Sequence, residues 1–210
     1  MLLKHERFEG NGHSINLTGV SDGEGLFRVA DHFNEGGPSS LKDAPVIHDV
    51  HMIGGETSVT GGFIVQSEQQ HFIVKNCSST GVIRGECPSA FGGGGGICGF
   101  KCSGDILITH CWSSGAILGH AGGGIAGMAV GHENHEDNSV TISHCYSMGK
   151  IAARVGGGIC DRNAGESGMV LIKHCYSTGE IVGADSGGIT GGQTANRPWS
   201  CIHYPVPFKW

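Results

Sequence analysis

The chain has 210 residues, of which 39 are glycine and only 6 are proline. This much glycine without a collagen period is typical of many tight turns, and 38% hydrophobic residues indicate a chain that folds. The net charge is −6 and no cluster of Lys and Arg occurs, which excludes a groove for nucleic acid. No apolar run approaches the ~18 residues that span a bilayer, so we expect no membrane insertion.

The first 44 residues are the least regular part of the chain. Residues 1–7 lack the apolar stretch of a secretory signal. We therefore expect an intracellular protein or a virion component, or a surface-exposed protein whose signal has been removed. The segment from Phe8 to Ile15, with its two glycines, is interpreted as a first, irregular coil of the repeat that follows.

An internal repeat occupies residues 45–191. Its first element reads Ile/Val-x-Asn/His-Cys-x-Ser-x-Gly, and its four cysteines are separated by 34, 34 and 30 residues. A further copy begins at Ile47, with Val50 in the place of cysteine. A second element, Gly-x-Ile, and a third, Gly-Gly-Ile, follow each of the four copies. The four cysteines are Cys77, Cys111, Cys145 and Cys175.

Three short apolar segments per repeat, separated by glycine-rich corners, are typical of one coil of a solenoid. The sequence therefore predicts an all-β fold: a right-handed parallel β-helix of about six coils, with three short strands per coil, in one domain over residues 1–196. Equivalent residues of stacked coils form columns. The predicted interior columns are Ile47/Val74/Ile108/Ile142/Ile172, Ile83/Ile117/Ile151/Ile181 and Phe63/Ile97/Ile125/Ile159/Ile189.

Residues 197–210 break the repeat and are rich in proline and aromatic residues. The end of a solenoid exposes strand edge and apolar interior, and terminal repeats are usually atypical for this reason. We expect this tail to cap the end of the solenoid, or else to dock onto a protein partner or another subunit.

The Gly-Gly-Ile-x-Gly element followed by Ile-x-His/Asn-Cys-Tyr-Ser-x-Gly resembles the GLUG-type repeats of bacterial adhesins, and similar β-helical repeats occur in large DNA viruses and algae. The resemblance covers residues 45–191, and the segment from Phe8 to Gly12 is similar to the first coil of such domains. The chain departs from the bacterial motif by having Gly-Gly-Ile in place of Gly-Leu-Val. The resemblance implies a right-handed β-helix and a surface or adhesive role, with no catalytic residues.

The nine cysteines are an odd number and include no CxxC pair. Four of them occupy one repeat position, which indicates small, buried side chains, and we expect free thiols there. Cys98 and Cys160 each follow the isoleucine of the third element and are interpreted in the same way. Any disulfide is expected to involve the cysteines outside the columns, which are Cys87, Cys102 and Cys201.

A polar column accompanies the cysteines. Three stacked histidines about 5 Å apart offer nitrogen ligands for a metal, but they would lie in a line, whereas a metal site needs ligands that converge. A structural role, in which the column satisfies backbone groups at a bend, is therefore favoured. The column consists of Asp49, Asn76, His110, His144 and His174.

Two places break the coil length and predict loops, near residues 84–91 and 129–138. From Gly81 to Ile97 is 16 residues against 10 in the other coils, and from Ile125 to Ile142 is 17 against 11 or 13. Loops on a rigid scaffold often carry binding residues. A divalent cation held by the second loop is weighed against a solvated acidic loop, which is favoured. The candidate binding residues are Arg84, Glu86, His132, Glu133, His135 and Asp137.

The sequence shows no catalytic set, no cofactor motif and no metal motif. It predicts a non-enzymatic structural or adhesive scaffold or binding module, which could be a subunit of a larger assembly or virion. The expected partner is a protein or a second copy of the chain, reached through the solenoid end or the tail, or else a glycan. The alternative is a polysaccharide-binding or polysaccharide-modifying protein of the lyase or epimerase kind, which rests on analogy between β-helical folds.

Overall fold

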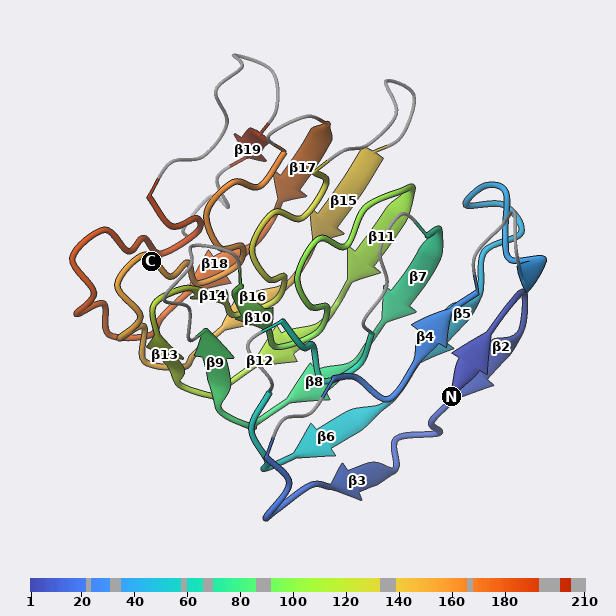
Figure 1. Cartoon of the computed structure of the whole chain (residues 1–210), viewed down its shortest axis with the longest axis horizontal. Helices are drawn as coiled ribbons and strands as arrows, with labels where there is room; N and C mark the ends of the chain where they lie inside the picture. Colours follow the sequence, from blue (N-terminus) through green and yellow to red (C-terminus); the bar gives the residue numbers. More distant parts are fainter. Residues whose placement is uncertain are drawn as a thin grey trace.

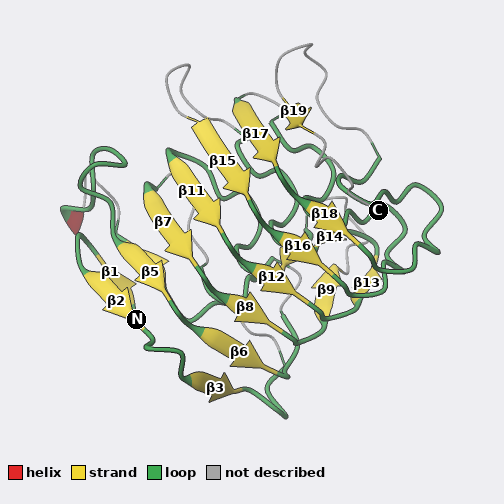
Figure 2. Cartoon of the chain, turned by 180° about the vertical axis from the view of Figure 1, so that it is seen from behind, coloured by secondary structure: helices red, strands yellow, loops and turns green. Residues whose placement is uncertain are grey.

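The chain was studied as a computed structural model, which describes residues 1–21, 24–30, 35–57, 60–65, 70–85, 92–132, 139–165, 168–192 and 201–204. Short strands, turns and irregular segments make up these residues, and Glu35 is the one described residue with a helical conformation (Figure 2). In the described ranges, no helix has the length and apolarity needed to cross a membrane.

The largest sheet has seven strands, and all of its pairs are parallel (Figure 1). Neighbours in the sheet come from successive repeats, as expected when each coil lies on the one before it. Its strands are β2 (Arg7–Glu9), β5 (Val46–His48), β7 (Phe72–Lys75), β11 (Ile106–Thr109), β15 (Ser139–Ser143), β17 (Met169–Lys173) and β19 (Cys201–Tyr204).

A second parallel sheet of six strands follows the first in each coil from β2 to β17. Its strands are β3 (Ser14–Asn16), β6 (His51–Ile53), β8 (Ser78–Ser79), β12 (Trp112–Ser113), β16 (Tyr146–Ser147) and β18 (Tyr176–Ser177).

Three short parallel pairs complete the described strands. Single bridges continue two of these pairs into later coils. The pair that contains Ile117 continues to Ile151 and Ile181, and the pair that contains Gly123 continues to Gly157 and Gly187. The pairs are β1 (Leu2–Leu3) with β4 (Arg28–Val29), β9 (Ile83–Gly85) with β13 (Ile117–Gly119), and β10 (Gly94–Gly95) with β14 (Gly122–Gly123).

The register confirms the first predicted column, because Ile47, Val74, Ile108, Ile142 and Ile172 pair in turn and are all 0% exposed. Burying stacked aliphatic side chains stabilises the fold by roughly 1.5–3 kcal/mol each. β-Branched residues also suit the pleated surface.

The other two columns are confirmed except at the last coil and at Phe63. Bridges from Gly62 to Gly95 and from Val65 to Cys98 place Ile64, rather than Phe63, beside Ile97, so the predicted place of Phe63 in the third column is wrong, although its side chain is buried. Ile83, Ile117 and Ile151 are fully buried, but Ile181 is 45% exposed, so its predicted interior position is wrong. It ends its column, with no described coil beyond it to cover the side chain. In the third column Ile189, on the same last coil, is only partly buried.

Glycine and serine are required where the second sheet faces the third element. The second sheet places Ser113 and Ser147 in one inward column, directly opposite Gly96 and Gly124. A Cβ at Gly124 would lie 2.5 Å from Ser147 Oγ and would collide with the carbonyl oxygen of Gly158. The small residues therefore set how closely these two walls approach.

The tail contributes one described strand. β19 pairs in parallel with β17 and continues the seven-stranded sheet at its end. The remainder of residues 197–210 lies outside the described residues, so the choice between capping and docking stays a prediction.

Candidate functional site

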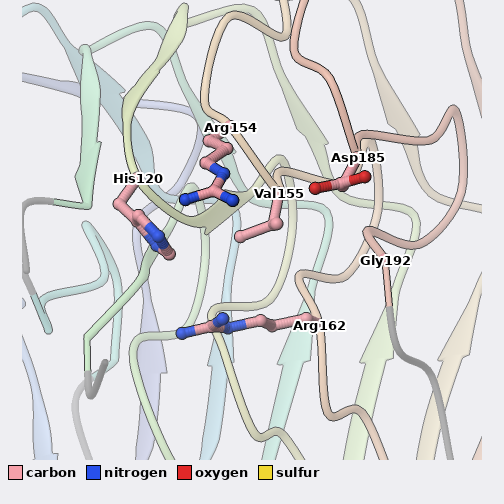
Figure 3. A pocket seen from close by; sticks show the side chains of 6 residues that line it. All are labelled: His120, Arg154, Val155, Arg162, Asp185 and Gly192. Carbon is pink, nitrogen blue, oxygen red and sulfur yellow. The ribbon is translucent and has the colours of Figure 1, made fainter.

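A cavity of about 350 Å³ opens at the corner where the coils turn into the third element (Figure 3). Its lining comes from two positions of the repeat. His120, Arg154 and Asp185 lie on three successive coils just before the third element, where the backbone N–H of Arg154 donates to Gly119 and that of Asp185 donates to Arg154. Arg162 and Gly192 lie just after the third element of their coils, and Val155 supplies an apolar wall.

The described lining of the cavity is predominantly basic, because it has two guanidinium groups and an imidazole but one carboxylate. In Figure 3 the side chains of His120, Arg154 and Arg162 surround one open space. The Arg154 side chain is exposed and makes no hydrogen bond or ion pair with the described residues. The Nδ1 atom of His120 is buried and has no hydrogen-bond partner in the same part of the chain. Such a site can attract an anion and hydrogen-bond to it.

A buried carboxyl, Asp161, lies beside this cavity. It is 0% exposed, and its Oδ1 accepts a hydrogen bond of 2.6 Å from the backbone N–H of the adjacent Arg162. Its Oδ2 has no partner among the described groups. Burial raises the pKa of Asp161 to about 7, although Arg162 favours the ionised form. Gly93 leaves room for this carboxyl, because a Cβ at that position would overlap Asp161 Oδ2.

The loop residues predicted to bind a ligand are only partly described. Arg84 lies in β9 rather than in a loop, and its guanidinium forms a bidentate ion pair with Glu56, with Nε 3.0 Å from Oε2. His132 ends a turn in which its N–H donates to the Ala129 carbonyl. No hydrogen bond or ion pair joins these two described residues. The other four candidates, which are Glu86, Glu133, His135 and Asp137, lie outside the described residues.

The polar column forms the bend between the two large sheets. Its five residues all have a positive φ, between 50° and 57°, a conformation in which Asn, Asp and His are enriched. The sequence predicted that the side chains of this column satisfy backbone groups at a bend, but the contribution comes from the backbone of these residues. The backbone N–H groups of the first four residues donate to the next coil, that of His110 to Ser143 O at 3.1 Å. The side chains of the last four residues are exposed, and that of Asp49 is partly exposed.

The histidines of this column stack on one another. The rings of His110 and His144 are 4.9 Å apart with an interplanar angle of 4°, and His174 follows at 4.9 Å. Within the described ranges, no group of three or more His, Cys, Asp or Glu residues has an arrangement that could hold a metal ion.

An aromatic ladder runs along the outer face of the second sheet. Trp112 and Tyr146 stack at 6.1 Å between ring centroids, and Tyr146 and Tyr176 at 5.2 Å, with nearly parallel planes. Because each ring face is covered by its neighbour, only the ends of the ladder offer a free face. A sugar ring therefore cannot lie flat along it, and the ladder stabilises coil stacking.

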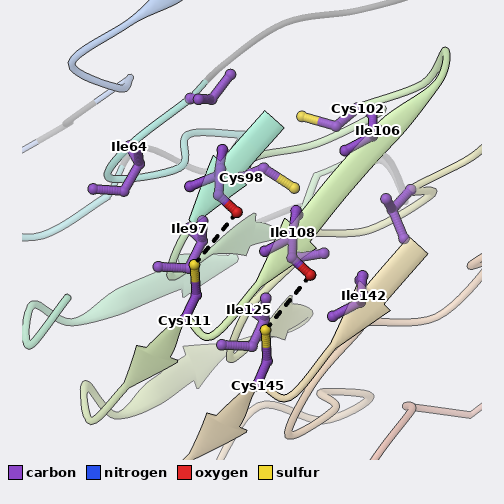
Figure 4. Packing of buried hydrophobic residues seen from close by; sticks show 14 of the residues in the cluster. Ile64, Ile97, Cys98, Cys102, Ile106, Ile108, Cys111, Ile125, Ile142 and Cys145 are labelled. Atoms are coloured by element: carbon purple, nitrogen blue, oxygen red, sulfur yellow. Dashed lines mark hydrogen bonds between the residues drawn. The ribbon is translucent and has the colours of Figure 1, made fainter. Parts of the chain in front are cut away.

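The described thiols are free and buried, as predicted for the columns, and Cys102 is one of them. The Sγ atoms of Cys111 and Cys145 each donate to a carbonyl oxygen of the preceding coil, at 3.8 Å (Figure 4). Burial and the neighbouring thiols raise the pKa of Cys111 well above its ordinary value, so it stays protonated and unreactive. Cys87 lies outside the described residues, and only the backbone of Cys201 is described.

A second polar cluster lies where the polar column meets the first coils. The ring of His51 places Nδ1 2.8 Å from Ser78 Oγ, but Ser78 is 2% exposed and closed to a substrate. The carboxylate of Asp49 contacts His48 at 2.7 Å rather than His51. This arrangement does not assemble a nucleophilic Ser–His–Asp triad.

Sequence reasoning missed the cavity, although two signals were present. Asp161 follows the third element at the position that Gly99, Gly127 and Gly191 occupy in other coils. A carboxyl in a column of glycines is a departure that needs a reason. Arg154, equivalent to His120 in the preceding coil, is the second departure.

No family model matches the chain, and no curated protein matches it. A crystal structure from Bacteroides ovatus, described as a putative immunoglobulin A1 protease, is similar with a TM-score of 0.58 and 21% sequence identity. The match covers 92% of this chain and 58% of that chain, so this chain spans little more than half of that structure. At this identity the likeness shows the fold alone.

Proposed function

We propose that the chain is a right-handed parallel β-helix of about six coils, with three short strands in each, that acts as a non-enzymatic scaffold and binding module. Parallel pairing of residues from successive repeats supports the coil arrangement. Connections between parallel strands of one sheet are right-handed in nearly all proteins, which supports the handedness. The resemblance to GLUG-type repeats of adhesins supports an adhesive role.

The observation that carries the proposal is that the repeated polar and aromatic side chains contact their own copies. The imidazoles of His110 and His144 stack, Tyr146 and Tyr176 stack, and like residues recur from coil to coil. Catalysis needs different groups that converge on one reacting atom, whereas ladders of like residues build rigidity. A rigid, regular face suits the presentation of a binding surface.

A second candidate function, modification of a polysaccharide, is favoured by one observation, the cavity. It combines an imidazole, His120, with two guanidinium groups, those of Arg154 and Arg162. A base beside a cationic group is what removal of a proton next to a carboxylate requires. The protease description of the similar structure is not carried over, because the likeness shows only the fold and Ser78 is closed.

A glycan array, an assay for unsaturated products on uronate polymers, and light scattering over a range of concentrations test the two candidates together. For a scaffold and binding module, we expect glycan binding or concentration-dependent assembly, with no product. Product formation on any polymer would overturn the non-enzymatic proposal in favour of the second candidate. A strict monomer that binds no glycan would overturn the binding proposal.

A further inference from the structure

The cavity lined by His120, Arg154, Arg162 and Asp185 holds more positive than negative charge. Its volume of about 350 Å³ lies at the lower end of the range for small-ligand sites, roughly 300–1,000 Å³. The size suits one ring of a small ligand rather than a bare ion. Val155 adds an apolar wall against which a ring can pack.

The basic groups are prepared for an anion. The guanidinium of Arg154 has no partner in the described part of the chain, and a guanidinium fork binds a carboxylate through two parallel hydrogen bonds. The buried, unpartnered Nδ1 of His120 marks a second polar group whose hydrogen bond is not made by the described residues. A buried polar atom without a partner is rare in folded proteins and points to a group that is still to bind.

Among the described lining residues, Asp185 is the one carboxylate, and it restricts which anion fits. Asp185 is exposed and makes no side-chain ion pair or hydrogen bond with the described residues. It would repel a dianionic phosphate more strongly than a singly charged group. It can also accept hydrogen bonds from hydroxyl groups, since an ionised carboxylate is only an acceptor. The lining therefore favours one negative charge on a hydroxyl-rich ring.

We propose that this cavity binds a uronate residue of an acidic glycan, with the ligand carboxylate on Arg154 and the ring hydroxyls facing Asp185 and His120. The inference rests on the proposed binding function and names its ligand class. A sulfate ester on a sugar shares the same chemistry of one charge on a hydroxyl-rich ring. The carboxylate is preferred because Arg154 presents a planar fork that matches a planar carboxylate in two bonds.

Isothermal titration calorimetry at low salt with trigalacturonate, a sulfated trisaccharide, a neutral galactose trisaccharide and inorganic phosphate tests the assignment. We expect trigalacturonate to bind more tightly than the other three probes. Arg154→Gln, which removes the charge from an exposed side chain, should weaken trigalacturonate binding roughly tenfold to hundredfold. The matched control is Lys150→Gln, which removes an exposed cation paired with Glu180 outside the cavity and should leave binding unchanged.

Asp185→Asn provides a readout that a general loss of folding cannot imitate. We expect it to strengthen phosphate binding more than trigalacturonate binding, because the repulsion removed is larger for a dianion and the amide oxygen of asparagine is a weaker acceptor for ring hydroxyls than the carboxylate. Equal binding of the neutral trisaccharide, tighter binding of the sulfated one, or an unchanged affinity in Arg154→Gln would each overturn the uronate assignment. If the array identifies only other glycans, the binding function stands and this inference fails.

Discussion

Replacing Asp161 by asparagine removes a carboxyl that the fold buries and that accepts a hydrogen bond from the backbone N–H of Arg162. With a pKa of about 7 instead of the ordinary 3.8, the folded chain keeps the Asp161 proton between about pH 4 and pH 7, where the unfolded chain has released it. The folded state therefore binds more protons in this window, and its stability falls as the pH rises. One pKa unit corresponds to ~1.4 kcal/mol, so the loss amounts to about 4 kcal/mol in the free energy of unfolding.

Urea unfolding of the wild-type chain and Asp161→Asn at pH 4, 6 and 8, followed by circular dichroism, measures this effect. We expect the difference in the free energy of unfolding to shift by ~4 kcal/mol in favour of the variant from pH 4 to pH 8. Carboxylates present in both proteins cancel, and any packing change adds a constant offset. Asp185→Asn, which removes an exposed carboxylate from the cavity, should show little of this shift. A difference that stays constant with pH would refute the argument that burial holds the proton on Asp161.

Three further predictions concern the scaffold. Gly124→Ala should lower the free energy of unfolding by ~3 kcal/mol, because its Cβ collides with Gly158 O. Gly188→Ala, whose Cβ meets no described atom nearer than 3.8 Å, should change it by less than ~1 kcal/mol. Equal values from urea unfolding would contradict the packing argument. His144→Val places a β-branched residue at a φ of 54° and should lower the free energy of unfolding by ~1–2 kcal/mol. His144→Asn should lower it by less than ~0.5 kcal/mol, because asparagine tolerates this conformation. A higher melting temperature for His144→Val than for His144→Asn would refute a backbone role. In iodoacetamide labelling read by mass spectrometry, Cys111 should react only in urea, and rapid labelling of the native chain would disprove its burial.

The interior columns could be predicted from the sequence because stacking converts a repeat in sequence into a register in space. The match from Ile108 to Ile142 needs only the recurrence of apolar residues and the parallel sheet. The exposure of Ile181 could not be read in this way. Its sequence position is equivalent to that of Ile151, and only its place at the end of the column distinguishes them.

The departures from the repeat at Asp161 and Arg154 mark this corner in the sequence, but the cavity itself could not be predicted, because side chains from two different positions of the repeat line it. His120, Arg154 and Asp185 share one corner, but Arg162 reaches the same space from the far end of the third element. Which side chains converge across that element depends on how sharply the corner turns, and the pattern of apolar residues carries no information about this. Arg84 is the opposite case, a predicted binding residue that has a structural role. It was expected in a binding loop, but its guanidinium pairs with Glu56 of the preceding coil.

The parallel register of the first sheet has a consequence for how such a chain can change. From Phe8 to Ile172 the paired residues are separated by 39, 27, 34, 34 and 30 positions, yet every pair lies in line. Differences in repeat length are thus accommodated in the segments between the strands, and the register of the first sheet is unchanged. A foreign peptide grafted between Ala129 and Ser139, where the chain already carries extra length, would be displayed on a fixed support without disturbing the rows on either side.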